Sequence, residues 1–146
     1  MSAIDSFNSS HFPAPYILVV DDIEDNRALL QVLLEGEGYV VETASEGYGA
    51  IAKIERHPPD LIVLDLMMPG LDGCGVAEWL AQNYPFIPVL VVTGCSEFPD
   101  FCHRYQLVAD CIRKPITFEE LLEKTRAFAA ASQHRRQSIY HFLDRN

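Results

Sequence analysis

The sequence has few positive charges and no long apolar run. Its 146 residues include 11 Lys and Arg but 21 Asp and Glu, a formal net charge of −10. A negative field repels phosphate backbones, which argues against nucleic acid as a partner. No apolar stretch approaches the roughly 20 residues that a membrane-spanning helix needs, and residues 1–10 lack the charged and apolar segments of a signal peptide. We therefore expect a cytoplasmic protein that contacts neither nucleic acid nor membrane.

The sequence also lacks the cysteine pattern of a disulfide scaffold. Its four cysteines form no Cys-x-x-Cys pair; they are Cys74, Cys95, Cys102 and Cys111. A chain of this size can stabilise itself through an apolar core, so it does not need disulfides. We expect four reduced thiols. A content of 49% hydrophobic and 22% charged residues suits one globular domain and excludes a disordered acidic segment.

Short apolar runs alternate with amphipathic segments along most of the chain. Residues 1–15 are rich in Ser, Asn and Pro and predict a flexible arm. Five runs are predicted as strands: Tyr16–Val20, Tyr39–Thr43, Leu61–Leu64, Pro88–Val92 and Ala109–Arg113. Five segments are predicted as helices: Asn26–Glu35, a segment capped by Ser45, Gly73–Asn83, Phe98–Tyr105 and Phe118–Ala131.

The alternation of these segments predicts the fold class. Continuous apolar strands without polar alternation are typical of a parallel sheet that is covered on both faces. Parallel strands need helical crossovers, which the alternation supplies. We expect an α/β, flavodoxin-like, doubly wound five-stranded parallel sheet in three layers. Residues 16–131 would form this domain, and residues 132–146 would extend the last helix or form a tail.

Polar residues follow four of the five predicted strands. In a doubly wound sheet, ligands bind outside the carboxyl ends of the strands. The residues at these ends are Asp21 and Asp22, Asp65, Thr93 and Gly94, and Lys114 before Pro115. Close carboxylates repel one another, so a cation must compensate them. An all-oxygen site suits Mg²⁺ or Mn²⁺.

A carboxylate on the middle strand can act as a nucleophile. Asp65 could attack an activated phosphoryl group and form an acyl phosphate. The metal and Lys114 would offset the charge on that group, and the Thr93 hydroxyl would donate a hydrogen bond to it. Each residue alone has a plainer explanation, such as a cap, a strand end or a solvated charge. The pair Asp72-Gly73 is assigned to turn and cap chemistry only. The joint occurrence at successive strand ends favours a phosphoacceptor site.

The same residues carry a resemblance to a known family. The matching pieces are Asp21-Asp22, the run from Asp65 to Gly73, Val92-Thr93 and Lys114-Pro115, in the family's order and nearly its spacing. In these motifs, residues 16–131 resemble the CheY-like receiver domain of two-component response regulators. The resemblance implies that Asp65 accepts a phosphoryl group from a histidine kinase or a phosphotransfer protein.

The resemblance also implies the roles of the neighbouring residues. Asp22, Asp65 and the main-chain carbonyl of Met67 would ligate Mg²⁺, and Asp21 would act through water. Lys114 would pair with Asp65 or its phosphate, and the Lys114–Pro115 bond would be cis. Thr93 and Gly94 would contact the phosphoryl group.

Three positions depart from the family pattern. Cys111 stands where the family has an aromatic residue that swings inward with the threonine, so switching is expected to depend on Thr93 and residues 94–98. Met67 and Cys95 stand beside the route of the attacking water, and neither side chain orients water well. We therefore expect slow loss of the phosphoryl group.

We interpret the chain as a stand-alone response regulator that turns over no external substrate. Its output would be altered contact with a downstream protein, with Phe101, Tyr105, Phe118 and Leu122 as contact candidates. Two alternatives remain: a pseudo-receiver that binds partners without phosphorylation, and a Mg²⁺-dependent aspartyl phosphatase. The phosphatase would need a second acid where Met67 stands.

The segment beyond residue 131 is basic, whereas the chain as a whole is acidic. Residues 117–146 carry 5 basic and 4 acidic groups, whereas residues 1–116 carry 6 and 17. If the tail is helical, Ile139, Phe142 and Leu143 share one face. The tail is either a frayed extension or a docking segment, and a homodimer would form through it or through the face of residues 98–131.

Overall fold

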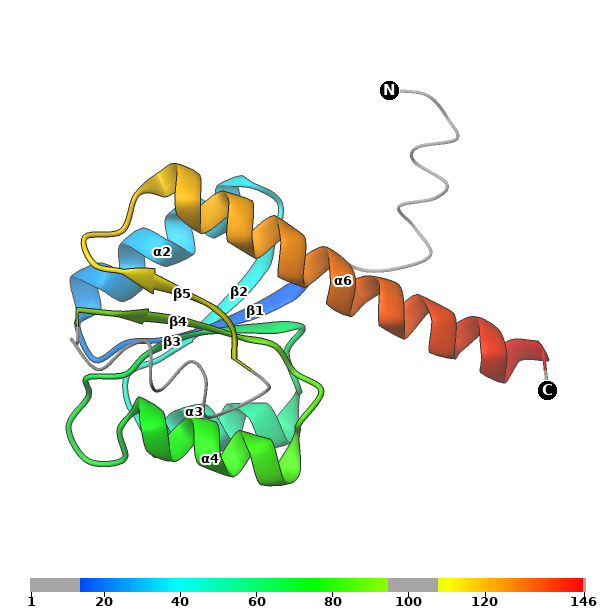
Figure 1. Ribbon diagram of the computed structural model, residues 1–146, viewed down its shortest axis with the longest axis horizontal. Helices are drawn as coiled ribbons and strands as arrows, with labels where there is room; N and C mark the ends of the chain where they lie inside the picture. The colour runs from blue at the N-terminus through cyan, green and yellow to red at the C-terminus, as the bar shows by residue number, and fades with distance from the viewer. Residues whose placement is uncertain (1–13, 95–107, 146) are drawn as a thin grey trace.

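The computed structural model describes residues 14–94 and 108–145 and contains one five-stranded parallel sheet (Figure 1). The strand order is β2-β1-β3-β4-β5. The strands are β1 (Tyr16–Val20), β2 (Val40–Ala44), β3 (Leu61–Asp65), β4 (Val89–Thr93) and β5 (Val108–Arg113). The described helices are α2 (Glu24–Gly36), α3 (Gly47–Arg56), α4 (Gly73–Asn83) and α6 (Phe118–Arg145).

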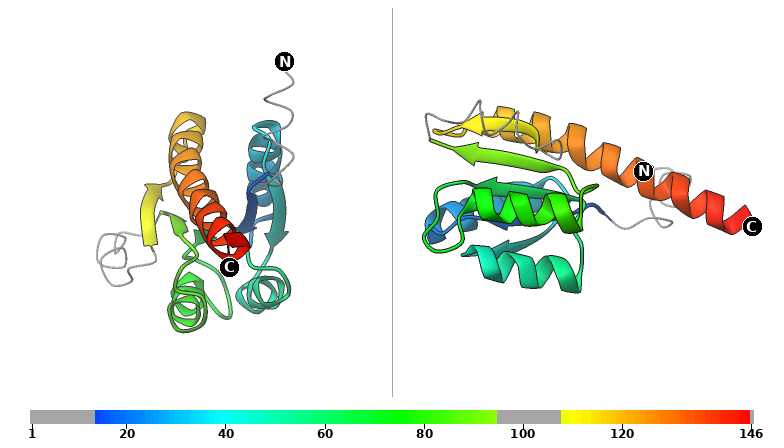
Figure 2. Two further views of the ribbon diagram at one scale, coloured as in Figure 1. Left: turned by 90° about the vertical axis from the view of Figure 1, so that its right-hand side faces the viewer. Right: turned by 60° about the horizontal axis from the view of Figure 1, so that its bottom comes forward.

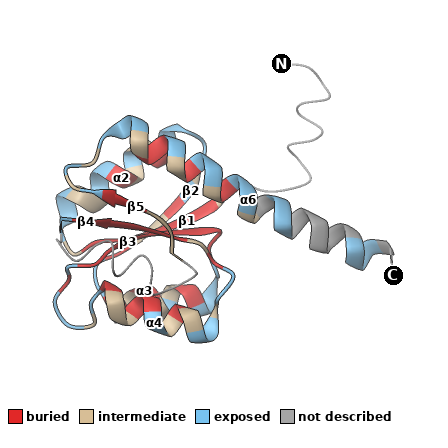
Figure 3. Ribbon diagram, viewed as in Figure 1, coloured by how far each residue is buried: buried red, intermediate tan, exposed pale blue. Residues whose placement is uncertain are grey.

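The helices cover both faces of the sheet. Figures 1 and 2 show α2 and α6 on one face and α3 and α4 on the other. Successive side chains of β1 point to opposite faces of the sheet. Ile17 and Val19 pack in the core under α2 and α6, whereas Leu18 and Val20 pack in the core under α3 and α4. The central strands are therefore buried throughout, as Figure 3 shows. The predicted three-layer α/β fold is confirmed.

The predicted boundaries hold within one or two residues, with two corrections. Helix α3 is capped by Glu46, whose carboxylate accepts hydrogen bonds from the N–H groups of Tyr48 and Gly49, and the predicted cap at Ser45 is wrong. Helix α6 does not end at Ala131 but continues to Arg145, because no Gly or Pro interrupts it. The predicted helix at 98–105 and residues 1–13 of the predicted arm lie outside the described residues.

None of the helices in the described part of the chain is both long and apolar enough to cross a membrane.

The strand register brings the polar strand ends to one edge of the sheet. Val20 pairs with Leu64, Asp65 with Val92, and Thr93 with Arg113. The residues that follow β1 and β5 therefore lie level with the last residues of β3 and β4. This register is what places Asp21 and Lys114 beside Asp65.

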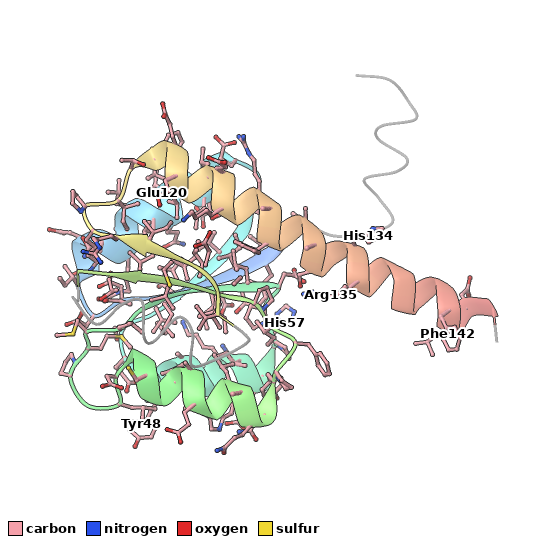
Figure 4. All side chains as sticks on the ribbon, in the orientation of Figure 1. Tyr48, His57, Glu120, His134, Arg135 and Phe142 are labelled. Carbon is pink, nitrogen blue, oxygen red and sulfur yellow. The ribbon has the colours of Figure 1, made fainter. Side chains whose placement is uncertain are left out.

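At the amino ends of the strands, on the side away from Asp65, polar side chains surround the buried Tyr16. The Asp60 carboxylate accepts a hydrogen bond from the Tyr16 N–H at 2.8 Å. The Tyr16 hydroxyl donates to Glu42 Oε2 at 3.1 Å, and its ring stacks on His57, which Figure 4 labels, with centroids 4.7 Å apart. Burial, the Glu42 charge and the hydrogen bond to Glu42 raise the pKa of Tyr16 to about 12.

The raised pKa of Tyr16 predicts a loss of stability at alkaline pH. The unfolded chain releases this proton near pH 10 and the folded chain near pH 12, so the stabilisation is complete below pH 10 and is lost as the pH rises through 12. A shift of this size corresponds to roughly 2–3 kcal/mol. We expect Tyr16→Phe to remove most of that alkaline decrease, measured as the free energy of unfolding in urea across this range.

Tyr48→Phe is the matched control, because the Tyr48 ring lies on the surface of α3. Its pH profile should follow that of the wild type. An unchanged alkaline decrease in Tyr16→Phe would contradict the assignment.

Candidate functional site

Three carboxylates meet at the carboxyl edge of the sheet. Oxygen atoms of Asp21, Asp22 and Asp65 all lie within 4.8 Å of one another. Asp21 and Asp65 are each only 3% exposed. Negative charges this close, and this poorly solvated, repel one another strongly. The cluster therefore favours a bound cation.

Lys114 supplies part of the required positive charge. Its Nζ lies 3.4 Å from Asp65 Oδ2, to which it donates a hydrogen bond, and 3.8 Å from Asp21 Oδ2. Its backbone N–H donates to the carbonyl of Thr93 at 3.0 Å, which fixes Lys114 beside the end of β4. The Lys114–Pro115 peptide bond is cis. One ammonium group against three carboxylates leaves the site negatively charged.

Asp65 occupies the centre of this arrangement. Burial raises the pKa of the Asp65 carboxyl, and the charge of Asp21 adds to the increase. The Met67 N–H, which donates to Asp65 Oδ1 at 3.1 Å, and Lys114 oppose the increase in pKa. The carboxylate is therefore both poorly solvated and held in one orientation.

Helix α2 and the residue before it position Asp21 through contacts that were not predicted from the sequence. Asp21 Oδ1 accepts a hydrogen bond from the N–H of Ile23 at 2.9 Å, and Oδ2 accepts one from Asn26 Nδ2 at 3.4 Å. The Arg27 guanidinium donates to the main-chain carbonyl of Asp21 at 2.9 Å. The only sequence signal for these residues is their position about one helical turn after the Asp21-Asp22 pair.

Gly73 allows α4 to begin against the end of β3. A Cβ atom at this position would lie 2.5 Å from the carbonyl oxygen of Asp65 and 2.6 Å from Leu66 Cα. The N-cap of α4 is Asp72, whose side chain accepts a hydrogen bond from the Gly75 N–H at 2.9 Å. The predicted cap at Asp72 is confirmed, and Gly73 has the further role of permitting this close approach.

The remaining predicted site residues lie around the same edge. Thr93 is fully buried at the end of β4, and the following Gly94 is exposed. Met67 follows Asp65 by two residues and has a largely exposed side chain. The structure thus brings together the side chains of Asp21, Asp22, Asp65 and Lys114, with Thr93 at the end of the neighbouring strand.

Cys111 differs from its sequence-based expectation. The residue is buried among the side chains under α3 and α4, and it is disulfide-bonded rather than reduced. Cys74 forms no disulfide, and Cys95 and Cys102 lie outside the described residues. The expectation of four reduced thiols is therefore wrong for Cys111. Spacing in sequence gave no sign of the bond, because it depends on which strands and loops the fold brings together.

Two of the predicted output contacts can be placed. Leu122 lies on the buried face of α6 and packs in the core against the sheet, so the prediction that it is a surface contact is wrong. Phe118 is half exposed at the start of α6. Phe101 and Tyr105 lie outside the described residues.

The donor set of the cluster suits a hard divalent cation. Every side chain of the cluster offers oxygen, and neither sulfur nor imidazole is present in it. Mg²⁺ and Mn²⁺ prefer such ligands, and Mg²⁺ typically takes only one or two carboxylates and keeps several waters. The buried excess of negative charge is the structural reason that the site fits such an ion.

An apolar cavity of about 240 Å³ adjoins the site. Its lining residues come from α2, from the segment between β5 and α6, and from the start of α6: Asn26, Leu29, Leu30, Leu33, Lys114, Pro115, Ile116 and Phe118. Lys114 therefore borders both the acidic cluster and an apolar surface.

The raised pKa of Asp65 predicts that this carboxylate destabilises the metal-free fold. Folding favours the protonated form, so stability falls as the pH rises from 3.8, the ordinary value, through the higher folded pKa. In a buffer with chelator, Asp65→Asn should have a higher free energy of unfolding than the wild type at neutral pH. The difference should shrink towards zero as the pH approaches 3.8, measured by urea titration at several pH values.

Asp72→Asn serves as the control for this prediction, because asparagine also caps helices and Asp72 is exposed. A wild-type protein that is more stable than Asp65→Asn at neutral pH without metal would contradict the argument.

Comparison with known proteins agrees with the fold and the acidic cluster described above. Residues 17–126 match the response regulator receiver domain family. The alkaline phosphatase synthesis transcriptional regulatory protein PhoP of Bacillus subtilis is 42% identical over 118 residues, which cover 80% of this chain and 49% of PhoP. The chain thus spans about half the length of this relative.

Solved structures show the same fold. A CheY-like receiver domain protein from Methanospirillum hungatei is 28% identical with a TM-score of 0.77, and the match covers 84% of this chain and 98% of that one. The response regulator TrrA of Thermotoga maritima, solved in complex with Mg²⁺ and BeF, is 31% identical with a TM-score of 0.72 over 78% and 98% of the two chains. The sheet, the edge with its acidic cluster and these matches agree, and the chain belongs to the response regulator receiver domain family of two-component systems.

Proposed function

We propose that the chain is a phosphorylation-controlled signalling module whose phosphoacceptor is Asp65. The phosphoryl group would come from a histidine kinase or a phosphotransfer protein, and the output would be an altered contact with a downstream protein. The observation that carries the proposal is the position of Asp65, which lies in a buried acidic cluster with Lys114 Nζ 3.4 Å away.

Some residues of the site would bind the metal, and others would contact the phosphoryl group. Asp22, Asp65 and the Met67 carbonyl would hold Mg²⁺, and Asp21, already hydrogen-bonded to α2, would contact it through water. Bound Mg²⁺ would supply positive charge beside the transferring phosphoryl oxygens. Lys114, whose Nζ lies 3.4 Å from Asp65 Oδ2, would supply a second positive charge.

The transfer itself would use one oxygen of the Asp65 carboxylate. This oxygen attacks the phosphorus, an acyl phosphate bond forms, and the bond from phosphorus to the donor's imidazole nitrogen breaks. The Met67 N–H holds the carboxylate in place during attack. The ammonium of Lys114 and the hydroxyl of Thr93 then donate hydrogen bonds to the new phosphoryl oxygens.

The surroundings of Lys114 favour a protein as phosphoryl donor. Leu29 and Phe118 are about half exposed beside the apolar cavity, and a protein surface could bury them while it presents its histidine to Asp65. A small phosphorylated metabolite is too small to bury these apolar side chains in the same way.

Switching would depend on Thr93 rather than on the aromatic position. Cys111 occupies that position, is buried, and has its side chain in a disulfide, so it cannot swing between two rotamers as a free aromatic ring can. Thr93 ends β4 beside Lys114, and its hydroxyl would follow the phosphoryl group.

Incubation with acetyl phosphate and Mg²⁺ tests the proposal directly. Intact-mass measurement should show a gain of one phosphoryl group in the wild type, none in Asp65→Asn, and little without Mg²⁺. Asp72→Asn should behave as the wild type, because Asp72 caps α4 outside the cluster. An equal gain in Asp65→Asn would contradict the proposal, and no gain in the wild type would favour a module that is never phosphorylated.

The exposed thioether of Met67 predicts a long-lived phosphoryl group. It can neither orient a water molecule nor accept its proton. We expect Met67→Asn to shorten the half-life of the phosphorylated protein severalfold, followed by intact mass after removal of acetyl phosphate, since the amide can hold the attacking water. Met67→Leu should decay like the wild type, and equal decay of all three proteins would show that this position does not control hydrolysis.

A further inference from the structure

Helix α6 is much longer than its contact with the sheet. Among the side chains of α6 that the structure describes, Ala129 is the last buried one, but the helix continues for 16 residues to Arg145. Figures 1 and 2 show this second half extending past the end of the sheet. Phe142 and Leu143 lie on this extension with about two thirds of their surface exposed, and Figure 4 places Phe142 close to its end. A projecting helix with exposed large apolar side chains is typical of an interaction surface.

An apolar groove lies where α6 leaves the sheet. Its volume is about 450 Å³, and its lining residues are Pro85, Phe86, Ile87, Pro88, Ala109, Phe128, Ala131 and Arg135. The Arg135 guanidinium donates a hydrogen bond to the carbonyl of Phe86 at 3.4 Å, which links the helix to the loop before β4. The Phe86 ring is 84% exposed at the rim of the groove.

The groove and the apolar end of α6 share one helix face. The groove residues Phe128, Ala131 and Arg135 are spaced by three and four positions, and the same spacing continues through position 138 to Phe142. This series is the seam of a heptad pattern, with Phe142 one heptad after Arg135. Phe142 cannot reach its own groove, because 11 residues of rigid helix hold it about 16 Å from Ala131.

We propose that the groove receives Phe142 of a second copy of this chain, in an antiparallel pair of α6 helices. A two-fold axis between residues 136 and 137 places Phe142 of each copy opposite Ala131 of the other. The small side chain of Ala131 leaves room for the ring, and Arg135 would then lie opposite position 138 rather than opposite its own copy. Both grooves are filled by the same contact, as a symmetric dimer requires.

The charge distribution favours the same partner. Residues 132–146 carry three cations and one carboxylate, namely Arg135, Arg136, Arg145 and Asp144. The remaining chain keeps 8 of the 11 cations and 20 of the 21 acidic residues. The positively charged extension of one copy is therefore attracted to the acidic domain of another.

Sedimentation velocity on the full chain tests the pairing. The wild type should show a concentration-dependent mass approaching twice 16.4 kDa. Ala131→Glu and Phe142→Lys, each of which places a charge in the seam, should raise the dimer dissociation constant by roughly tenfold or more. The neighbouring Ala130→Glu is the matched control, because Ala130 is also exposed but faces away from the seam, and it should dimerise normally.

The double variant Ala131→Glu/Phe142→Lys distinguishes the orientation of the helices. In the antiparallel pair, the carboxylate introduced at position 131 of each copy would meet the ammonium group introduced at position 142 of the other, so dimerisation should recover relative to both single variants. In a parallel pair, like charges would meet at both positions, and dimerisation would stay lost. Circular dichroism checks that each variant is folded.

Three outcomes overturn the proposal: a monomeric wild type up to millimolar concentration, equal weakening by Ala130→Glu and Ala131→Glu, or no recovery in the double variant. The result does not depend on the proposed phosphorylation, because Ala131→Glu should still gain a phosphoryl group from acetyl phosphate as the wild type does.

Discussion

The unequal balance of charge at the carboxyl edge of the sheet is the constraint on which the rest of the site depends. Three carboxylates are held together with one ammonium group, and two of the three are almost without solvent. Such an arrangement is unfavourable in isolation, since burial and Asp21 both raise the pKa of Asp65. It persists because the parallel register of β1, β3, β4 and β5 fixes where these residues lie. The core, rather than the site, therefore provides the stability that keeps the site in place.

The sequence predicted the sheet well for the same physical reason. β1, β3 and β4 are buried on both faces, and strands of that kind are apolar along their length. The polar exceptions in β3 and β4 are their last residues, Asp65 and Thr93, at the edge that carries the site. The edge strand β2 mixes buried and exposed positions, and its predicted start was one residue early. The residues that follow the strands could be predicted as a group, because a parallel sheet collects all its carboxyl ends on one side.

The supporting residues could not be predicted, because their roles depend on contacts between elements. Gly73 resembles any glycine after a capping aspartate until α4 is placed against Asp65 and Leu66. Asn26 and Arg27 look like surface residues of α2, and only the fold directs them to Asp21. The cap of α3 could not be chosen between Ser45 and Glu46 from residue type alone, since serine is the commoner cap and the glutamate is the one that reaches the free N–H groups.

The length of α6 could not be predicted from the sequence for a different reason. A helix whose apolar face has a sheet to cover is predicted by its periodicity, and that signal ends where the sheet ends, near Ala129. Nothing in the following residues breaks the helix, so the backbone continues without that support. The helix thus begins with Phe118 beside Lys114 and carries Ala131 and Arg135 at the groove, 13 residues and about 20 Å away. One rigid element touches both the phosphoryl site and the proposed dimer contact, yet no residue belongs to both, so the two can be altered independently.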